Sequence, residues 1–554
     1  MMLVHALPNA VILEDNGYCL FLHAEEKGEP VLNAHFSPLN ELDELDADQA
    51  EAVVACIGVF LHLKEMFAVL IREAQPASTS TWGAELVKEV IFYSIETGRR
   101  YSQTLTPSSS PSQTQVDMGN FAKFLSTSEF FFSASNMWDA TLNLSDQASL
   151  VQDALKALQP ASRGNATAFQ SSPVSNTHAG VDTRHINSDP QFIWNLYLLS
   201  PLFRIMDALD PSLRHEFDKR SFAVPICQGY FGSRVVKHGN EMVLLKVISR
   251  RRWARAGPRF CKRGIDLYGN CSNAAETETI LRYESNNKTM SFVQARASVP
   301  LLWKEKLSFQ GGPDVTIHEP LDDSVEPLKL HFHALLDKYS GPVHILNLMR
   351  DKNGTAEATL GSAFGEVLQM AKAQDQSLVR GTVYHKFDVH TVAGGQDAVP
   401  KTLYYTQHSV LDDMGYTEVC MDWQGEVREL TKKQIGVYRV NYCLDRTTLG
   451  GFVLSEATIG KFVKGQNEWV SFAGSALQQA HRDLFAENGD VLSDIYVGSP
   501  AMTSTFIRSG HATHKDVLVQ LQANRSRVKQ ALFWDLYKQD ETTELTGQQN
   551  EGSD

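Results

Sequence analysis

Apolar residues in the N-terminal part of the chain occur in short runs separated by polar or glycine-containing breaks, a pattern typical of β-strands. Two runs, Val53–Leu63 and Met66–Glu73, are apolar enough to be buried strands. The acidic stretch Leu42–Ala52 predicts a surface helix or loop. The shorter strands that we expect here are Ala10–Leu13, Tyr18–His23 and Val90–Ile95.

The second half of the chain alternates strand-like and helical patterns. Thr355–Gln374 carries apolar residues at helical spacing, whereas Val343–Leu348 is a short apolar run of the kind found in central strands. Thr382–His390 and Ile435–Asn441 predict two further strands. Strands separated by helices are typical of an α/β fold, so we expect an α/β core that follows a β-rich N-terminal region.

Two segments rich in Ser, Thr, Pro and Gln predict disordered loops, near 101–118 and 160–188. Between them we expect a strand at Phe130–Ser133 and a helix that starts near Asp139. These segments therefore divide the ordered parts of the N-terminal region.

Composition narrows the class of protein. A net charge of −14 and a hydrophobic content of 43% are typical of a globular protein and argue against a general nucleic-acid binder. The cysteines are scattered and never form a C-x-x-C pair, so we expect neither a disulfide framework nor a structural zinc site. No apolar run approaches the ~20 residues that a helix needs to cross a bilayer, so we expect peripheral membrane contact at most.

One segment departs from this acidic background. Lys246–Arg263 contains 8 basic residues in 18 positions and no acidic one. Arginine forks match phosphate oxygens, which favours capture of a phosphorylated anion at an anionic membrane surface. A solvated basic face that pairs with acids elsewhere explains the same composition equally well.

Two glutamates follow the basic segment, and their spacing along the chain matters if they lie on a strand. Glu276 and Glu278 lie two residues apart, so a strand would place both on one face. They could hold arginines in position or poise a proton, and a solvated acidic edge is the alternative.

The segment Ile248–Leu281 combines the arginine-rich stretch with an R-G-x-D element, a G-N pair and an E-T-E triplet. This order closely resembles the signature of Sac-domain phosphoinositide phosphatases. The resemblance covers roughly Val4 to Gly510. The other segments that carry it are Phe192–Leu202, Phe222–Ser233, Ser291–Trp303, Tyr384–His390 and Asn488–Gly510.

The resemblance implies an N-terminal Sac subdomain over 1–190, an α/β catalytic subdomain over 191–515 similar to cysteine phosphatases, and a C-terminal helix with a polar tail over 516–554. It implies removal of phosphate from phosphatidylinositol monophosphates without a metal or other cofactor. The expected partner is a phosphoinositide lipid at a cytosolic membrane face, with a protein adaptor as a further candidate and no nucleic acid. We expect a stand-alone Sac domain in the cytoplasm, peripherally associated with endomembranes and without a transmembrane anchor.

The family's catalytic loop has the form C-x5-R-T, and the matching stretch here, Tyr438–Thr448, reads YRVNYCLDRTT. Its end is intact, but the residue six before Arg446 is Val440. If Arg439 and Asn441 are matched instead to the family's R-T-N, Tyr442 stands in the place of the nucleophile. Five intervening residues normally wrap a phosphate with backbone N–H groups while the cysteine attacks in line.

The resemblance assigns catalytic roles to Cys443, Asp445, Arg446 and Thr447. Arg446 would stabilise the transferring phosphoryl group, Thr447 would assist hydrolysis, and Asp445 is either an acid or the N-cap of the next helix. In Met502–Thr505, Thr503 stands where the family commonly has a lysine. Expected substrate-binding residues are Arg250, Arg252, Arg255, Arg259, Arg263, Glu276 and Glu278.

Three explanations of the altered loop stay open. The chain is an inactive member that still binds phosphoinositide, or the printed sequence lacks a few loop residues, or Cys443 acts from a rearranged loop.

Overall fold

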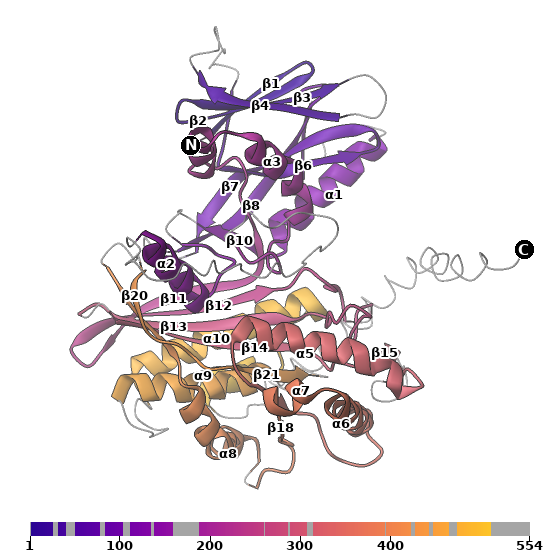
Figure 1. The fold of residues 1–554 in the computed structure, drawn as a ribbon, viewed down its shortest axis with the longest axis vertical. Coiled ribbons are helices and arrows are strands. Elements are labelled where there is room, and N and C mark those ends of the chain that lie inside the picture. The colour runs from indigo at the N-terminus through magenta and orange to yellow at the C-terminus, as the bar shows by residue number, and fades with distance from the viewer. Residues whose placement is uncertain are drawn as a thin grey trace, which may run out of the picture. The chain divides into compact units, whose positions relative to one another are not determined.

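The computed structural model divides the chain into two compact units (Figure 1). The first contains Met1–Phe231, Arg250–Trp253 and Val419–Leu430, and the second contains Gly232–Ser249, Ala254–Glu418 and Thr431–Asp554. The structure describes residues 2–25, 31–39, 50–77, 83–103, 111–133, 138–158, 188–259, 261–285, 288–306, 314–393, 395–422, 427–442, 447–464 and 474–510.

Two antiparallel strand arrays dominate the first unit. Five strands pair in the order β4-β3-β2-β1-β5, and further strands pair in the order β10-β8-β7-β6 with β9 beside β8. Their bounds are β1 Met2–Leu7, β2 Ala10–Asp15, β3 Tyr18–Glu25, β4 Val31–Pro38, β5 Glu51–Val53, β6 Ala55–His62, β7 Glu65–Pro76, β8 Ala84–Ser94, β9 Arg100–Ser102 and β10 Phe130–Ser133. The expected β-rich N-terminal region is therefore confirmed.

Helices cover these strands. The helices of the first unit are α1 Gln113–Thr127, α2 Leu144–Leu158, α3 Leu196–Ala208 and α4 Pro211–Asp218. Leu199 and Leu202 of α3 are buried in one core with Leu20 and Leu70. Gly58 of β6 allows this close packing, because a Cβ there would lie 2.4 Å from the Cβ of Leu198.

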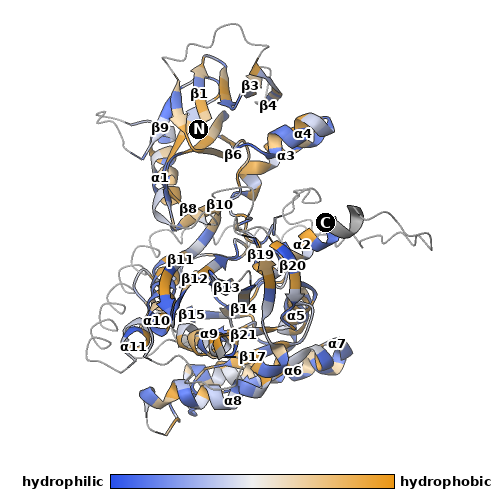
Figure 2. Cartoon of the chain, turned by 90° about the vertical axis from the view of Figure 1, so that its left-hand side faces the viewer, coloured by the Kyte–Doolittle hydropathy of each residue, from blue (hydrophilic) through white to orange (hydrophobic). Residues whose placement is uncertain are grey.

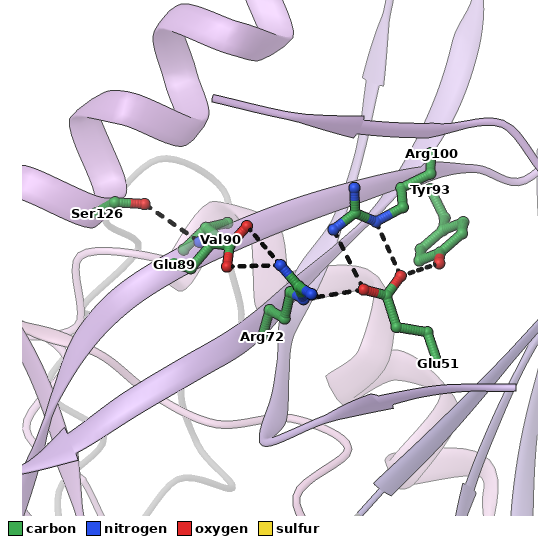
Figure 3. A network of polar contacts seen from close by, with 7 residues as sticks. All are labelled: Glu51, Arg72, Glu89, Val90, Tyr93, Arg100 and Ser126. Carbon is green, nitrogen blue, oxygen red and sulfur yellow. Dashed lines mark hydrogen bonds and ion pairs between the residues drawn. The ribbon is translucent and has the colours of Figure 1, made fainter. Parts of the chain in front are cut away.

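A polar network joins four strands of the first unit (Figure 3). The Glu51 carboxylate of β5 accepts from Arg72 Nε at 3.0 Å, from Arg100 Nε at 2.8 Å and from the Tyr93 hydroxyl. Arg72 also donates to Glu89 at 2.9 Å. Burial and the neighbouring Glu51 carboxylate raise the pKa of Tyr93. Side chains of the network therefore link β5, which pairs with β1, to β7, β8 and β9 of the other array.

The second unit contains a mixed sheet in the order β18-β17-β21-β14-β13-β12-β11. Strands β14, β21, β17 and β18 are parallel, and β13 runs antiparallel to β14. Bounds from β11 onward are β11 Cys227–His238, β12 Glu241–Arg251, β13 Ala275–Tyr283, β14 Lys288–Ser298, β15 Trp303–Lys306, β16 Asp314–Ile317, β17 Val343–Asn347, β18 Thr382–Lys386, β19 Thr417–Met421, β20 Val427–Lys432 and β21 Val437–Tyr442. Strands β11, β12, β19 and β20 have residues in both units.

Helices lie on both faces of the parallel strands. On one face, Phe332 of α5 and Phe364 of α6 share a buried core with Ile345 and Val437. On the other face, α8 packs on α9, and α9 contacts β14 and β21. Figure 2 shows α6, α7 and α8 with both hydrophobic and hydrophilic positions, as expected for helices that cover a sheet. The helices are η3 Leu321–Ser324, α5 Val325–Tyr339, α6 Ala356–Gln374, α7 Gln376–Gly381, η4 Gln396–Ala398, α8 Val399–Met414, α9 Thr447–Lys464, α10 Ala476–Val497 and α11 Ser504–Ser509.

The predicted α/β class is confirmed, and two local expectations need correction. Helix α1 begins at Gln113, inside the segment expected to be a disordered loop, because Ser112 and Gln115 form a reciprocal capping box. Helix α2 begins at Leu144 rather than near Asp139, whose carboxylate instead accepts from the Thr141 N–H at 2.8 Å. Of the expected loop near 160–188, only residue 188 is described. The expected tail over 516–554 lies wholly outside the described residues.

Among the helices that the structure describes, none combines the length and the hydropathy needed to cross a bilayer.

We predict that Glu51→Gln lowers the free energy of unfolding by about 1–2 kcal/mol, because one carboxylate serves two arginines and a buried tyrosine. Urea denaturation measures the loss, which should shrink at high salt because the arginines are solvent-exposed. Glu326→Gln is the matched control, since Glu326 forms an i,i+3 pair with Lys329 on α5. An equal loss in the two variants would contradict the network's role.

Candidate active site

The carboxyl end of β21 leads toward helix α9 at the centre of the second unit's sheet. β21 is parallel to both neighbours, with Tyr438 in register with Gln294 of β14 and with His344 of β17. The strand ends at Tyr442 and α9 begins at Thr447. Ligands of α/β folds bind at such carboxyl edges, and anions bind at helix N-termini.

A small pocket opens beside the start of α9, with a volume of about 10 Å³, roughly the room that one water molecule needs. Its walls come from β13, β14, β21, α9 and α10. They are formed by Thr277, Gln294, Ala295, Arg296, Val440, Thr447, Thr448, Gly451, Phe485 and Asn488. Thr447 and Thr448 are both buried. The pocket therefore lies where the first turn of α9 meets two neighbouring strands.

Two amide side chains in the pocket wall have an unused acceptor. Gln294 Nε2 donates to the Gly451 carbonyl at 3.0 Å, but Gln294 Oε1 has no hydrogen-bond partner in the described part of the chain. Asn488 Oδ1 likewise has no hydrogen-bond partner within the described ranges. Both side chains are at least nine-tenths buried. A buried acceptor without a donor is costly, so this small pocket favours a donor of the size of a water molecule.

Small residues bring α9 close to its neighbours. A Cβ at Gly450 would lie 2.5 Å from Leu348 Cδ1, and one at Gly451 would lie 3.0 Å from Gln294 Oε1. On α10, a Cβ at Gly489 would lie 2.5 Å from Thr448 Cγ2. The glycines cost helix propensity, but they allow the contacts that fix the first turn of α9.

The expected catalytic residues divide between described and undescribed positions. Cys443, Asp445 and Arg446 lie outside the described residues, whereas Thr447 is the first residue of α9. Val440, six residues before Arg446, is buried in β21 and lines the pocket. Thr503, in place of the family's lysine, is buried just before α11.

Arg439 points to the opposite face of β21 from the pocket-lining Val440. It donates to Ser298 O at 2.7 Å and to His331 Nε2 at 3.2 Å, and it also donates to Asn441 Oδ1. Arg439 is fully buried. It thereby fixes the carboxyl ends of β21 and β14 rather than lining the pocket.

The basic segment does not form an exposed face. Of its eight basic residues, Lys246, Arg250, Arg251, Arg259 and Arg263 are buried, and the other three are half-buried. The solvated-face alternative is therefore wrong. The chain buries these charges because each guanidinium finds carbonyl, carboxylate or aromatic partners.

The structure places the expected arginine ligands in different surroundings. Arg250 and Arg252 belong to the first unit, where Arg250 donates to Ala140 O and Leu142 O, each at 2.7 Å. Arg252 is half-buried there. In the second unit, Arg255 donates to Ser272 Oγ at 3.0 Å.

Arg259 and Arg263 meet at one buried carboxylate. Arg259 Nη2 donates to Glu305 Oε1 at 2.7 Å, and Arg263 Nε donates to Glu305 Oε2 at 2.6 Å. Burial alone would raise the pKa of Glu305, but the charges of Arg263 and Arg259 outweigh it and lower the pKa. Arg263 also lies over the rings of Trp303 and Tyr496.

Glu276 and Glu278 both lie on β13, where a spacing of two residues places both side chains on one face of the strand. Both are buried, so a solvated acidic edge is wrong. Glu276 accepts from the Tyr339 hydroxyl at 2.8 Å and lies 3.8 Å from Lys338 Nζ, while Glu278 accepts from Ser291 Oγ at 2.6 Å.

Gln294, Thr448 and Asn488 were missed as candidate site residues. Gln294 and Asn488 stand in segments that carry the family resemblance, yet glutamine and asparagine are common structural residues. Only their convergence on one pocket distinguishes them, and that convergence depends on tertiary packing.

A strand that leads to a helix N-terminus at the carboxyl edge of parallel strands is the arrangement that this geometry defines. Comparison with known proteins gives the family: residues 54–393 match the SacI homology domain, more than half of the chain. The chain therefore belongs to the SacI homology family, as the resemblance of its sequence indicated.

Curated relatives carry related names. The chain is 29% identical over 384 residues to polyphosphatidylinositol phosphatase INP53 of Saccharomyces cerevisiae, covering 67% of this chain and 33% of that protein. It is 31% identical over 368 residues to phosphoinositide phosphatase SAC7 of Arabidopsis thaliana, covering 65% and 57%. For phosphatidylinositol-3-phosphatase SAC1 of S. cerevisiae the identity is 28% over 380 residues, covering 66% and 58%. The matches thus span between about a third and three-fifths of these relatives.

We predict that Glu305→Gln destabilises the protein by about 3–5 kcal/mol, because it leaves two buried guanidinium groups without their carboxylate. Thermal and urea unfolding measure the loss. Because the pKa of Glu305 is lowered in the folded state, its contribution is present above the unfolded pKa and is lost as the pH falls. A variant as stable as the wild type would contradict the ion cluster.

Gly489→Ala should lower the melting temperature, although alanine is the better helix former, because its Cβ would collide with Thr448. Gly365→Ala on α6 is the matched control, since no atom lies within 4 Å of a Cβ there, and it should raise the melting temperature. If both variants are stabilised, the close approach of α10 to α9 is wrong.

Proposed function

We propose that this chain is a phosphoinositide phosphatase that removes phosphate from phosphatidylinositol monophosphates. The observation that carries the proposal is the sequence C-L-D-R-T, Cys443–Thr447, which follows the end of β21 along the chain and runs up to the first residue of α9. Membership of the SacI homology family and the names of the relatives support the same substrate class.

The proposed reaction has two steps. The Cys443 thiolate attacks phosphorus, an S–P bond forms, and the bond from phosphorus to the inositol oxygen breaks. That oxygen takes a proton from Asp445. Water then attacks the phosphocysteine and gives a proton to the Asp445 carboxylate, the S–P bond breaks, inorganic phosphate leaves, and the thiolate returns. Arg446 and the first N–H groups of α9 hold the phosphoryl oxygens, and Thr447 assists the second step by hydrogen bonding.

The pocket beside the start of α9 supports a site that keeps a water molecule at hand for the second step. Gln294 Oε1 and Asn488 Oδ1 are acceptors, without partners among the described residues, in the pocket that Thr447 and Thr448 line. A water molecule matches this small space and brings the donors that both acceptors need.

A second candidate is phosphoinositide binding without turnover. One observation favours it: the residue six before Arg446 is Val440, a buried strand residue without a nucleophile. Cys443 lies only three residues before Arg446, so its attack requires a tighter loop than C-x5-R.

The location follows from the substrate class. We propose that the chain acts at the cytosolic face of endomembranes, held there peripherally by lipid or by a protein adaptor. The expected substrate-binding residues were Arg250, Arg252, Arg255, Arg259, Arg263, Glu276 and Glu278. We propose instead that Arg259, Arg263, Glu276 and Glu278, which are buried in the second unit, support the site and do not touch the lipid headgroup.

Phosphate release from dispersed phosphatidylinositol 4-phosphate tests the proposal. Arg446→Ala should lower release by about 100-fold or more, because it removes a charged donor to the transferring group. Cys443→Ser should abolish release, and Cys261→Ser, an exposed cysteine outside the loop, should leave it unchanged.

Two other results are informative. Binding to phosphoinositide vesicles that depends on Arg446, without phosphate release, would favour the second candidate. If the chain neither releases phosphate nor binds vesicles in an Arg446-dependent way, both candidate functions are contradicted.

A further inference from the structure

A short turn of the second unit exposes two large apolar side chains at its tip. Leu267 is 69% exposed and Tyr268 is 84% exposed, although their neighbour Ile265 is completely buried. Leu330, half-exposed on α5, lies directly beside the turn, because a Cβ at Gly269 would lie 2.9 Å from Leu330 Cβ. Leu330 thus lies beside the backbone of the turn whose tip exposes Leu267 and Tyr268.

The turn holds its shape without help from the two exposed side chains. Its base closes through Ser272 N to Gly264 O at 2.8 Å and through Asp266 N to Asn270 O at 3.0 Å. The Asp266 carboxylate accepts from the N–H groups of Tyr268 and Asn270, at 3.0 and 2.8 Å. The acid is therefore occupied by the backbone, and the fixed turn presents Leu267 and Tyr268 outward.

The base of the turn is bound to the edge of the sheet that carries the proposed active site. Gly264 N donates to Ser298 Oγ at 3.0 Å, and Ser298 N donates to Ser272 O at 3.2 Å. Ser298 is in register with Tyr442, the last residue of β21 before the catalytic segment. The base of the turn is thus linked through Ser298 to Tyr442, the residue at which β21 ends.

We propose that Leu267 and Tyr268, flanked by Leu330, contact the interfacial region of a lipid bilayer and hold the active-site edge against the membrane. Leucine and tyrosine suit this role, since one brings apolar area and the other an amphipathic ring that favours the headgroup level. Lys262, two residues before the turn begins at Gly264, is half-buried and adds one positive charge that suits anionic headgroups. The lipid nature of the occupant rests on the proposed function.

Sedimentation of the full chain with vesicles of phosphatidylcholine and phosphatidylserine tests the contact without any need for turnover. The double variant Leu267→Ser, Tyr268→Ser should bind about tenfold more weakly or worse, as loss of the buried area of two side chains requires. Tyr197→Ser is the matched control, because Tyr197 is 72% exposed on α3 in the first unit. Tyr268→Trp should retain binding, because tryptophan is equally suited to the interface.

Substrate form separates this inference from the proposed function. The double variant should release phosphate from a water-soluble short-chain phosphatidylinositol phosphate at the wild-type rate, and from vesicles more slowly. If no form of the chain releases phosphate, the proposed function fails, and vesicle binding alone decides this inference. Three results would overturn the membrane contact: no vesicle binding by the wild type, an equal loss of binding in Tyr197→Ser, or equal binding by the wild type and the double variant. Equal binding by the wild type and the double variant would point to a protein partner for the turn.

Discussion

The parallel pairing of β21 between β14 and β17 determines where chemistry can occur in this protein. It brings Tyr442, Ser298 and Asn347 to one edge of the sheet, and it sends the chain from that edge toward the N-terminus of α9. A helix N-terminus has unsatisfied N–H groups and a partial positive charge, so a phosphate can be bound there with little further cost. The pocket, the glycine contacts and the apolar turn are all arranged around this edge.

Buried charged side chains also stabilise the segments around the carboxyl ends of β21 and β14. Arg439 fixes Ser298 and Asn441 from the face opposite the pocket, while Glu305 joins Arg259 and Arg263 in a cluster that also contacts Tyr496 of α10. Such groups are expensive to bury and are retained only when each charge is matched. The arginine-rich signature of this chain therefore has a structural role in addition to any contact with substrate.

The sequence predicted the elements better than the site. Val343–Leu348 and Thr355–Gln374 match β17 and α6 within a residue or two, because uniform apolar runs and helical spacing are local signals. The start of α1 was missed because a capping box overrides a Ser- and Pro-rich composition. Local signals could not show that Arg250 is buried against Ala140 and Leu142, or that Gln294 and Asn488 converge on one pocket, because these contacts join residues far apart in the chain.

A crystal structure of the chain soaked with tungstate, which mimics phosphate and is located by its anomalous scattering, tests the central claim most directly. The account predicts one anion at the first turn of α9, beside Thr447 and within reach of the Arg446 guanidinium. An Arg446 side chain that points away from the pocket, with no anion at the start of α9, would contradict it.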